Sequence, residues 1–128
     1  MKALSVKQPW ASLIAGGHKT IEWRSWRTHY RGPLLICSGK TPDDIYFEFD
    51  PDEARQNWPL GVAVATVELV EVRPFDARKD AEAAMLDEDA LPSVQGFSWV
   101  LENPVAVPDT PPVRGKQGLF EVTLQPAP

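Results

Sequence analysis

A chain of 128 residues, 43% of them hydrophobic, is long enough to bury one substantial core. No apolar run approaches the roughly 18 residues that a membrane span requires, and the N-terminus lacks the apolar stretch of a signal peptide, so we expect a cytoplasmic protein. The single cysteine excludes an internal disulfide, and with only two histidines beside it we expect no metal site and no cofactor.

The net charge of −5 is unevenly distributed. Residues 1–40 carry seven Lys and Arg against one Glu, whereas residues 41–128 carry six against seventeen acids. An acidic chain is a poor candidate for bulk nonspecific nucleic-acid binding, but a local basic patch can attract a ligand that carries phosphate. We therefore predict that the bases of residues 1–40 gather on one side of the molecule. The alternative is that they are dispersed over a solvated surface.

Short strands and turns are predicted along the first third of the chain. The alternation in Lys2–Val6 is typical of a strand. Gln8–Ala15 is predicted to be a short helix, because Pro9 suits a first helical turn and the glycines at 16 and 17 end it. There follow, in order, a strand at Thr20–Trp26, a turn at Thr28–Pro33 and a buried strand in the apolar run Leu34–Cys37.

The rest of the chain is predicted to contain a long loop, three strands and one helix. Residues 40–58 are expected to be loop with a helical turn around Asp52–Asn57, and the β-branched run Gly61–Val72 is the clearest strand. The remaining elements are a helix at Asp76–Asp89, a strand at Phe97–Leu101, a stiff proline-rich connection at Asn103–Pro112 and a strand at Leu119–Leu124.

Five or six short strands with two or three helices do not alternate as βαβ units would. The pattern indicates an α+β, mainly β domain built as a small, partly open mixed barrel with peripheral helices. We expect residues 1–125 to form this single domain and residues 126–128 a loose tail. The core is predicted to contain Leu4, Leu13, Ile14, Leu35, Val64, Leu69, Phe120 and Val122. Small barrels bind ligands where loops and a helix converge at the mouth.

The segment from Gly17 to Trp26 concentrates the charged and aromatic residues of a candidate site. Side chains alternate along a strand, so Glu22 and Arg24 share one face. They form either a structural ion pair or a ligand site in which Glu22 accepts from an exocyclic amine and Arg24 contacts phosphate. Lys19 is assigned to the turn, where Gly17 frees its direction toward a groove. There it would bind phosphate or act as a base, with Glu22 as its partner, unless it is a solvated turn lysine.

Further ligand-binding candidates flank this segment. Lys7, Gln8 and Trp10 surround a predicted helix N-terminus, whose free amides attract anions, although core packing is an alternative for Trp10. Trp26 and Arg31 lie in a stretch of aromatic residues and arginines that suits base stacking with backbone contacts. The alternative there is an aromatic corner covered by arginine stems.

Several motifs together resemble the ASCH (activating signal cointegrator homology) domain family. Ser5–Ala11 is followed by a Gly-x-Lys-x-x-Glu-x-Arg signature at Gly17, Lys19, Glu22 and Arg24. Phe97–Pro104 and Arg114–Phe120 look like the closing hairpin of the family, so the resemblance extends from Ala3 to about Val122. It implies a barrel similar to the PUA RNA-binding fold.

The resemblance also implies what such a domain does. Family members are linked to RNA binding, some are small amidohydrolases that deacylate N4-acetylcytidine, and ribonuclease activity has been attributed to others. The amidohydrolase branch looks like Gly-x-Lys-Thr-x-Thr-x-Arg; Lys19 matches its lysine, and Glu22 replaces its second threonine. We predict binding of RNA or a modified nucleoside or nucleotide in a cleft between the Gln8–Ala15 helix and the barrel. The alternatives are a hydrolase acting on such a ligand, with Lys19 and Glu22 catalytic, and a protein-interaction module.

Overall fold

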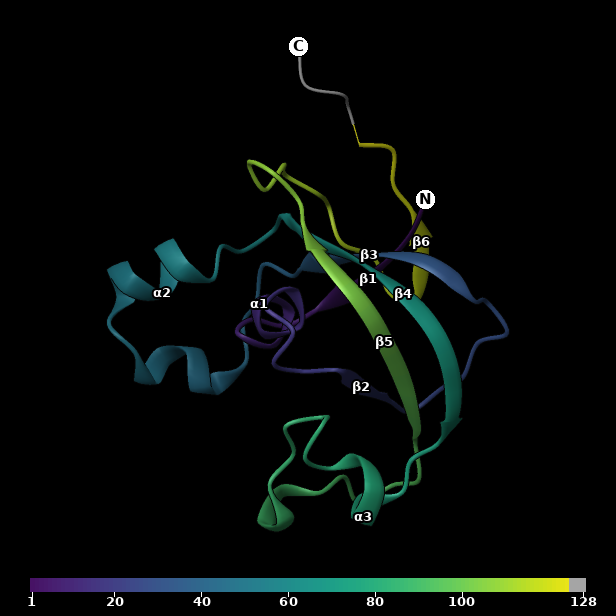
Figure 1. The fold of residues 1–128 in the computed structure, drawn as a ribbon. Coiled ribbons are helices and arrows are strands. Elements are labelled where there is room, and N and C mark those ends of the chain that lie inside the picture. Colours follow the sequence, from purple (N-terminus) through teal and green to yellow (C-terminus); the bar gives the residue numbers. More distant parts are fainter. Residues whose placement is uncertain (125–128) are drawn as a thin grey trace.

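A computed structural model describes residues 1–124 as one curled, six-stranded mixed sheet with short helices around it (Figure 1). The sheet order is β2-β5-β4-β3-β1-β6. Strands β1 and β3 are parallel, and every other neighbouring pair is antiparallel. The strands are β1 Lys2–Val6, β2 Ile21–Arg24, β3 Gly32–Ser38, β4 Ala63–Pro74, β5 Phe97–Ala106 and β6 Leu119–Glu121. This half-barrel confirms the predicted fold class.

The helices are short and lie around the sheet (Figure 1). Helix α1 (Trp10–Ala15) lies inside the curl and packs against β1, β3, β4 and β5. The others are η1 (Asp44–Glu48), α2 (Pro51–Asn57), α3 (Ala77–Asp80) and η2 (Glu88–Ala90). Within residues 1–124, none of these helices has the length and apolar character needed to cross a bilayer. The expected tail at residues 126–128 lies outside the described residues.

The predicted helix at Asp76–Asp89 is wrong in length, because α3 ends at Asp80. The carbonyl of Ala83 accepts hydrogen bonds from the amides of Thr20 and Ile21 at the start of β2. The carbonyl of Ala84 accepts from the Lys19 ammonium. These carbonyls therefore serve another part of the chain instead of a continuing helix, and alanine-rich composition alone could not indicate this competition.

Strand β5 runs five residues further than predicted, through Pro104 to Ala106. It stays paired with β4 because two register shifts in that ladder absorb the irregular backbone, which includes Asn103 at φ 53°. A bulge is one of the few places in a sheet where proline is tolerated. The proline-rich segment is therefore partly strand, and only its second half is a connection.

The buried residues form two clusters, not the single predicted core. Alternation along β3 sends Leu34 and Ile36 into the larger cluster, with Leu4, Ile14, Leu69 and Trp99. Leu35 and Cys37 join Ala3 and Phe120 in a smaller cluster on the opposite face. Of the predicted core residues, Leu13 and Val122 are only half-buried. A strand buried on both faces explains why this run is continuously apolar.

Native protein should resist thiol reagents at Cys37. The side chain is fully buried, and burial raises the pKa of its thiol to about 11. Because the thiolate is the reactive species, labelling with a disulfide reagent near pH 8 should be at least about 100-fold slower than for an exposed thiol. Denaturant should restore one rapid equivalent, since Cys37 is the one cysteine of the chain. Fast labelling without denaturant would show that β3 opens readily.

Candidate functional site

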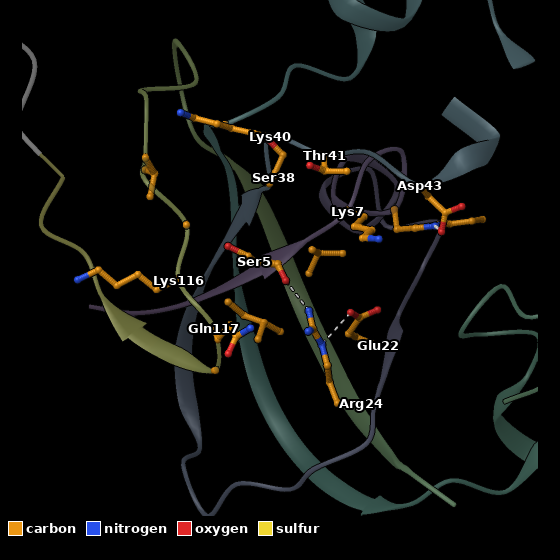
Figure 2. A pocket seen from close by; sticks show the side chains of 18 of the residues that line it. Ser5, Lys7, Glu22, Arg24, Ser38, Lys40, Thr41, Asp43, Lys116 and Gln117 are labelled. Atoms are coloured by element: carbon orange, nitrogen blue, oxygen red, sulfur yellow. Dashed lines mark hydrogen bonds and ion pairs between the residues drawn. The ribbon is translucent and has the colours of Figure 1, made fainter. Parts of the chain in front are cut away.

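A cleft of about 1250 Å³ lies between the β1–α1 segment, strand β2, the end of β3 and the loop that precedes β6 (Figure 2). The curl of the sheet creates it, because β2 and β1 are first and fifth in sheet order yet face each other across this space. Its polar lining comes from segments far apart in the sequence: Ser5, Lys7, Glu22, Arg24, Ser25, Ser38, Lys40, Thr41, Asp43, Arg114, Lys116 and Gln117.

Glu22 and Arg24 lie side by side in the cleft, as their shared strand face predicts (Figure 2). Arg24 Nε is 3.1 Å from Glu22 Oε2, and its Nη2 donates to the backbone carbonyl of Ser5. Arg24 therefore connects β2 to β1 across the curl. The structural ion pair and the ligand-site interpretation are compatible, since both side chains also line the cleft.

Lys19 does not point into the cleft, and the expectation that it projects from an exposed turn is wrong. Its side chain is only 5% exposed. The ammonium donates to the Ala84 carbonyl at 2.6 Å and lies 3.4 Å from Glu22 Oε1. Burial lowers the pKa of Lys19, and the nearby Glu22 carboxylate only partly offsets this. Lys19 thus forms an ion pair with Glu22 from the side of the protein interior and does not line the cleft.

Two other predicted ligand residues also lie outside the cleft lining. Gln8 is fully buried, and its amide group donates to Ser12 Oγ and the Pro59 carbonyl while accepting from the Ser12 amide. It therefore fixes the start of α1. Arg31 is exposed, and its guanidinium donates to the carbonyls of Thr28 and Tyr30 in its own turn. Neither contact orients these side chains toward a ligand in the cleft.

The predicted aromatic residues Trp10 and Trp26 both line the cleft. The indole nitrogen of Trp10 donates to Asp43 Oδ2 at 3.1 Å, which holds the ring against the loop after β3. Trp26 packs edge-to-face on buried Trp99, with ring centroids 4.7 Å apart and an interplanar angle of 80°. Both rings are half-buried, so each combines packing with a surface that a planar ligand can reach.

Basic side chains outnumber acidic ones in the cleft: Lys7, Arg24, Lys40, Arg114 and Lys116 against Glu22 and Asp43. Arg24 is paired with Glu22. The ion pairs found within residues 1–124 include none of the other four bases. The cleft therefore has an excess of positive charge on a protein whose net charge is −5.

The predicted gathering of the bases of residues 1–40 is only partly correct. Lys7, Arg24 and Lys40 reach the cleft. Lys2 instead pairs with Glu121 at 2.9 Å, and the Arg27 guanidinium lies over the Phe97 ring, 5.7 Å from its centroid. The other basic residues of the cleft include Arg114 and Lys116, which belong to the acidic part of the chain. A charge count over residues 1–40 could not include them.

The loop at 113–118 is the main feature that sequence reasoning missed as part of the site. The Val113 amide donates to the Gly61 carbonyl at 3.0 Å, which anchors the start of the loop. At Gly115 a Cβ would lie 2.6 Å from Ser5 Oγ, so a larger residue would require Ser5 or the loop to shift. The sequence signal that could have indicated this loop is the pair of basic residues Arg114 and Lys116, which lie on either side of Gly115.

Within residues 1–124 no three His, Cys, Asp or Glu side chains come together in a way that would hold a metal ion. The two cleft carboxylates are separately engaged, Glu22 by Lys19 and Arg24, and Asp43 by Trp10. The cleft is thus chemically a cationic groove with aromatic walls and one ion-paired carboxylate.

Similar proteins are known from sequence. Human activating signal cointegrator 1 is 26% identical over 130 residues, a match that covers 93% of this chain and 22% of the human protein. The mouse protein of the same name is 55% identical over 40 residues, which cover 30% of this chain and 7% of that protein. The chain thus spans about a fifth of the length of the human relative.

Solved structures with the same fold come from Zymomonas mobilis. The crystal structure of its ASCH protein has a TM-score of 0.64 at 14% identity and covers 95% of this chain and 87% of that chain. A single-residue variant of the same protein has a TM-score of 0.67 with the same coverage. At this identity the likeness concerns the fold alone. The family model of the ASCH domain matches residues 4–111, and the chain therefore belongs to the ASCH domain family.

Proposed function

We propose that the cleft binds RNA or a nucleotide-containing ligand. Its phosphates would contact the four basic side chains of the lining that form no ion pair within residues 1–124, which we call the basic rim: Lys7, Lys40, Arg114 and Lys116. The observation that carries this proposal is the excess of positive charge in the cleft of an acidic protein. Lys7, Lys40, Arg114 and Lys116 are all exposed, so a ligand can reach them. Cations gathered around a groove lower the free energy of bound phosphates and release counterions from the ligand.

The aromatic wall supports the same ligand class. Trp10 and Trp26 line the cleft together with the bases, so a chain that follows the basic rim passes two indole surfaces. Base stacking on aromatic side chains is tolerant of sequence and is worth about 1–3 kcal/mol per base. The Trp10–Asp43 and Trp26–Trp99 contacts hold both rings in place before a ligand binds, which lowers the entropic cost of stacking.

The proposal predicts a large loss of affinity when the loop bases are removed. We expect the double variant Arg114→Ala/Lys116→Ala to bind a single-stranded RNA of about 10 nucleotides roughly 10- to 30-fold more weakly at 0.1 M salt. If both side chains contact phosphates, the slope of log affinity against log salt should fall by about 1.4. Fluorescence anisotropy titrations at several salt concentrations measure both quantities.

The matched control is Arg78→Ala/Lys79→Ala. These two bases are exposed on α3 outside the cleft, and their removal changes the net charge by the same amount. Equal weakening by both double variants would mean that only overall charge matters, and the cleft would not be the binding site. A parent protein that binds no RNA or nucleotide under low salt would overturn the proposal. Release of acetate from N4-acetylcytidine in the same mixture would instead identify the protein as a hydrolase.

A further inference from the structure

A carboxylate in a cationic cleft needs a specific explanation, because it repels the phosphates that the rest of the cleft attracts. The two carboxylates of the cleft differ in how fully they are engaged. Asp43 accepts from the Trp10 indole through Oδ2 and from the Ile45 amide through Oδ1, so it is occupied by its own loop. Glu22 has only cations as partners within residues 1–124, and its remaining lone pairs are available for a donor from a ligand.

The position of Glu22 is tightly held from both sides. Lys19 lies 3.4 Å from Oε1 and Arg24 lies 3.1 Å from Oε2, so one cation is attached to each carboxylate oxygen. Each oxygen of an ionised carboxylate has two lone pairs, which leaves one acceptor site on each. The side chain keeps 12% of its surface exposed, and Glu22 lines the cleft. The carboxylate is thus held in place before a ligand binds, with acceptor capacity left on both oxygens.

We propose that Glu22 reads the base of the ligand and selects guanine. This inference rests on the proposed binding of RNA or nucleotides in the cleft. The pairing edge of guanine has two adjacent donors, N1–H and the N2 amino group, which match the two oxygens of one carboxylate. Adenine and cytosine offer one donor beside an acceptor, and uracil offers one donor between two carbonyls. The acceptors of these three bases would face the carboxylate and repel it.

Arg24 and the basic rim complete the arrangement. Arg24 pairs with Glu22 and donates to the Ser5 carbonyl, so it fixes the position of the carboxylate while both side chains line the cleft. The phosphates of the ligand contact the basic side chains of Arg114 and Lys116, which lie on a different wall of the cleft from Glu22. Affinity and base selection therefore reside in different residues, and variants can separate them.

The test uses oligouridylates of equal length that differ in one central base, so that every ligand carries the same phosphates. The parent protein should bind the oligomer with guanine best. Replacing guanine with hypoxanthine removes only the N2 amino group and should weaken binding about 5- to 30-fold, with adenine, cytosine and uracil at least as weak. Equal affinity for guanine and hypoxanthine, with normal salt dependence, would overturn the base selection and leave the phosphate-binding proposal intact. Failure of every oligomer to bind would overturn the proposed function itself.

Variants give a second, independent readout. Glu22→Gln replaces one acceptor by a donor, so the guanine preference over hypoxanthine should disappear while adenine or cytosine gains relative to guanine. Lys116→Ala should weaken all oligomers by a similar factor and leave their ranking unchanged. Circular dichroism and melting temperature check that both variants are folded. If Glu22→Gln does not fold, the guanine–hypoxanthine comparison on the parent still decides the question. A folded Glu22→Gln protein that keeps the guanine preference would overturn the inference.

Discussion

Replacing Asp80 with alanine should lower the free energy of unfolding by about 2–4 kcal/mol, because it removes the shared acceptor of a buried hydrogen-bond network. The Asp80 side chain is 1% exposed. Its Oδ1 accepts from Arg73 Nη2 at 2.7 Å, and its Oδ2 accepts from Ser98 Oγ at 2.8 Å and from the Asp76 amide at 3.2 Å. Removal of the carboxylate leaves the buried Ser98 hydroxyl without its partner and frees the start of α3 from β5. Urea denaturation at neutral pH measures the loss.

The same network makes a pH prediction. Burial of the Asp80 carboxyl opposes its ionisation, but the hydrogen bonds from Arg73, Ser98 and the Asp76 amide outweigh this and lower its pKa. The folded protein therefore binds this proton less readily than the unfolded chain. The stability that Asp80 contributes is complete above its ordinary pKa of 3.8 and is lost as the pH falls through the lower folded value.

The control for Asp80 is Asp52→Ala. Asp52 pairs with Arg55 on an exposed helix surface, with side-chain exposures of 89% and 67%. An exposed pair of this kind contributes less than about 1 kcal/mol. Similar losses for Asp80→Ala and Asp52→Ala would show that the network around Asp80 is not specially stabilising.

Replacing Lys19 with alanine should cost about 2–4 kcal/mol and lower the melting temperature by roughly 6–16 °C. The change removes the donor to the Ala84 carbonyl, one of the two cations on Glu22, and the buried methylene chain of the lysine. A solvated turn lysine, the alternative that the sequence left open, would contribute almost nothing. Exposed Lys79 is the matched control, and its replacement by alanine should change the stability by less than about 0.5 kcal/mol.

The pH dependence of this effect has a definite sign. Because burial lowers the pKa of Lys19 below 10.5, the unfolded chain binds this proton in a range where the folded protein does not. The part of the stability that depends on this proton should therefore rise as the pH increases through the folded pKa toward 10.5 and fall as the pH decreases through that folded value, while the packing of the methylene chain does not depend on pH. Unchanged melting of Lys19→Ala together with loss of RNA binding would return Lys19 to the ligand site.

Local patterns in the sequence predicted much of the fold correctly. The apolar run of β3 indicated a strand because consecutive residues are buried. The β-branched run of β4 indicated a strand because burial alternates along its middle part. The helix at Asp76–Asp89 was predicted too long because its alanines and acids favour helix, while the carbonyls at 83 and 84 bind the start of β2. Competition between distant segments has no signature in local composition.

For the candidate site, the sequence alone determined the family resemblance and the shared strand face of Glu22 and Arg24, since side chains alternate along a strand. The structure then showed that the two side chains form an ion pair. Only the tertiary structure decided that Lys19 is buried behind Glu22, that Gln8 and Arg31 bind their own backbone neighbours, and that the loop at 113–118 forms the opposite wall of the cleft. The physical reason is the curl of the sheet, which brings β2 opposite β1. Contacts between strands so far apart in sheet order depend on the sum of many small packing energies along the chain, not on any one motif.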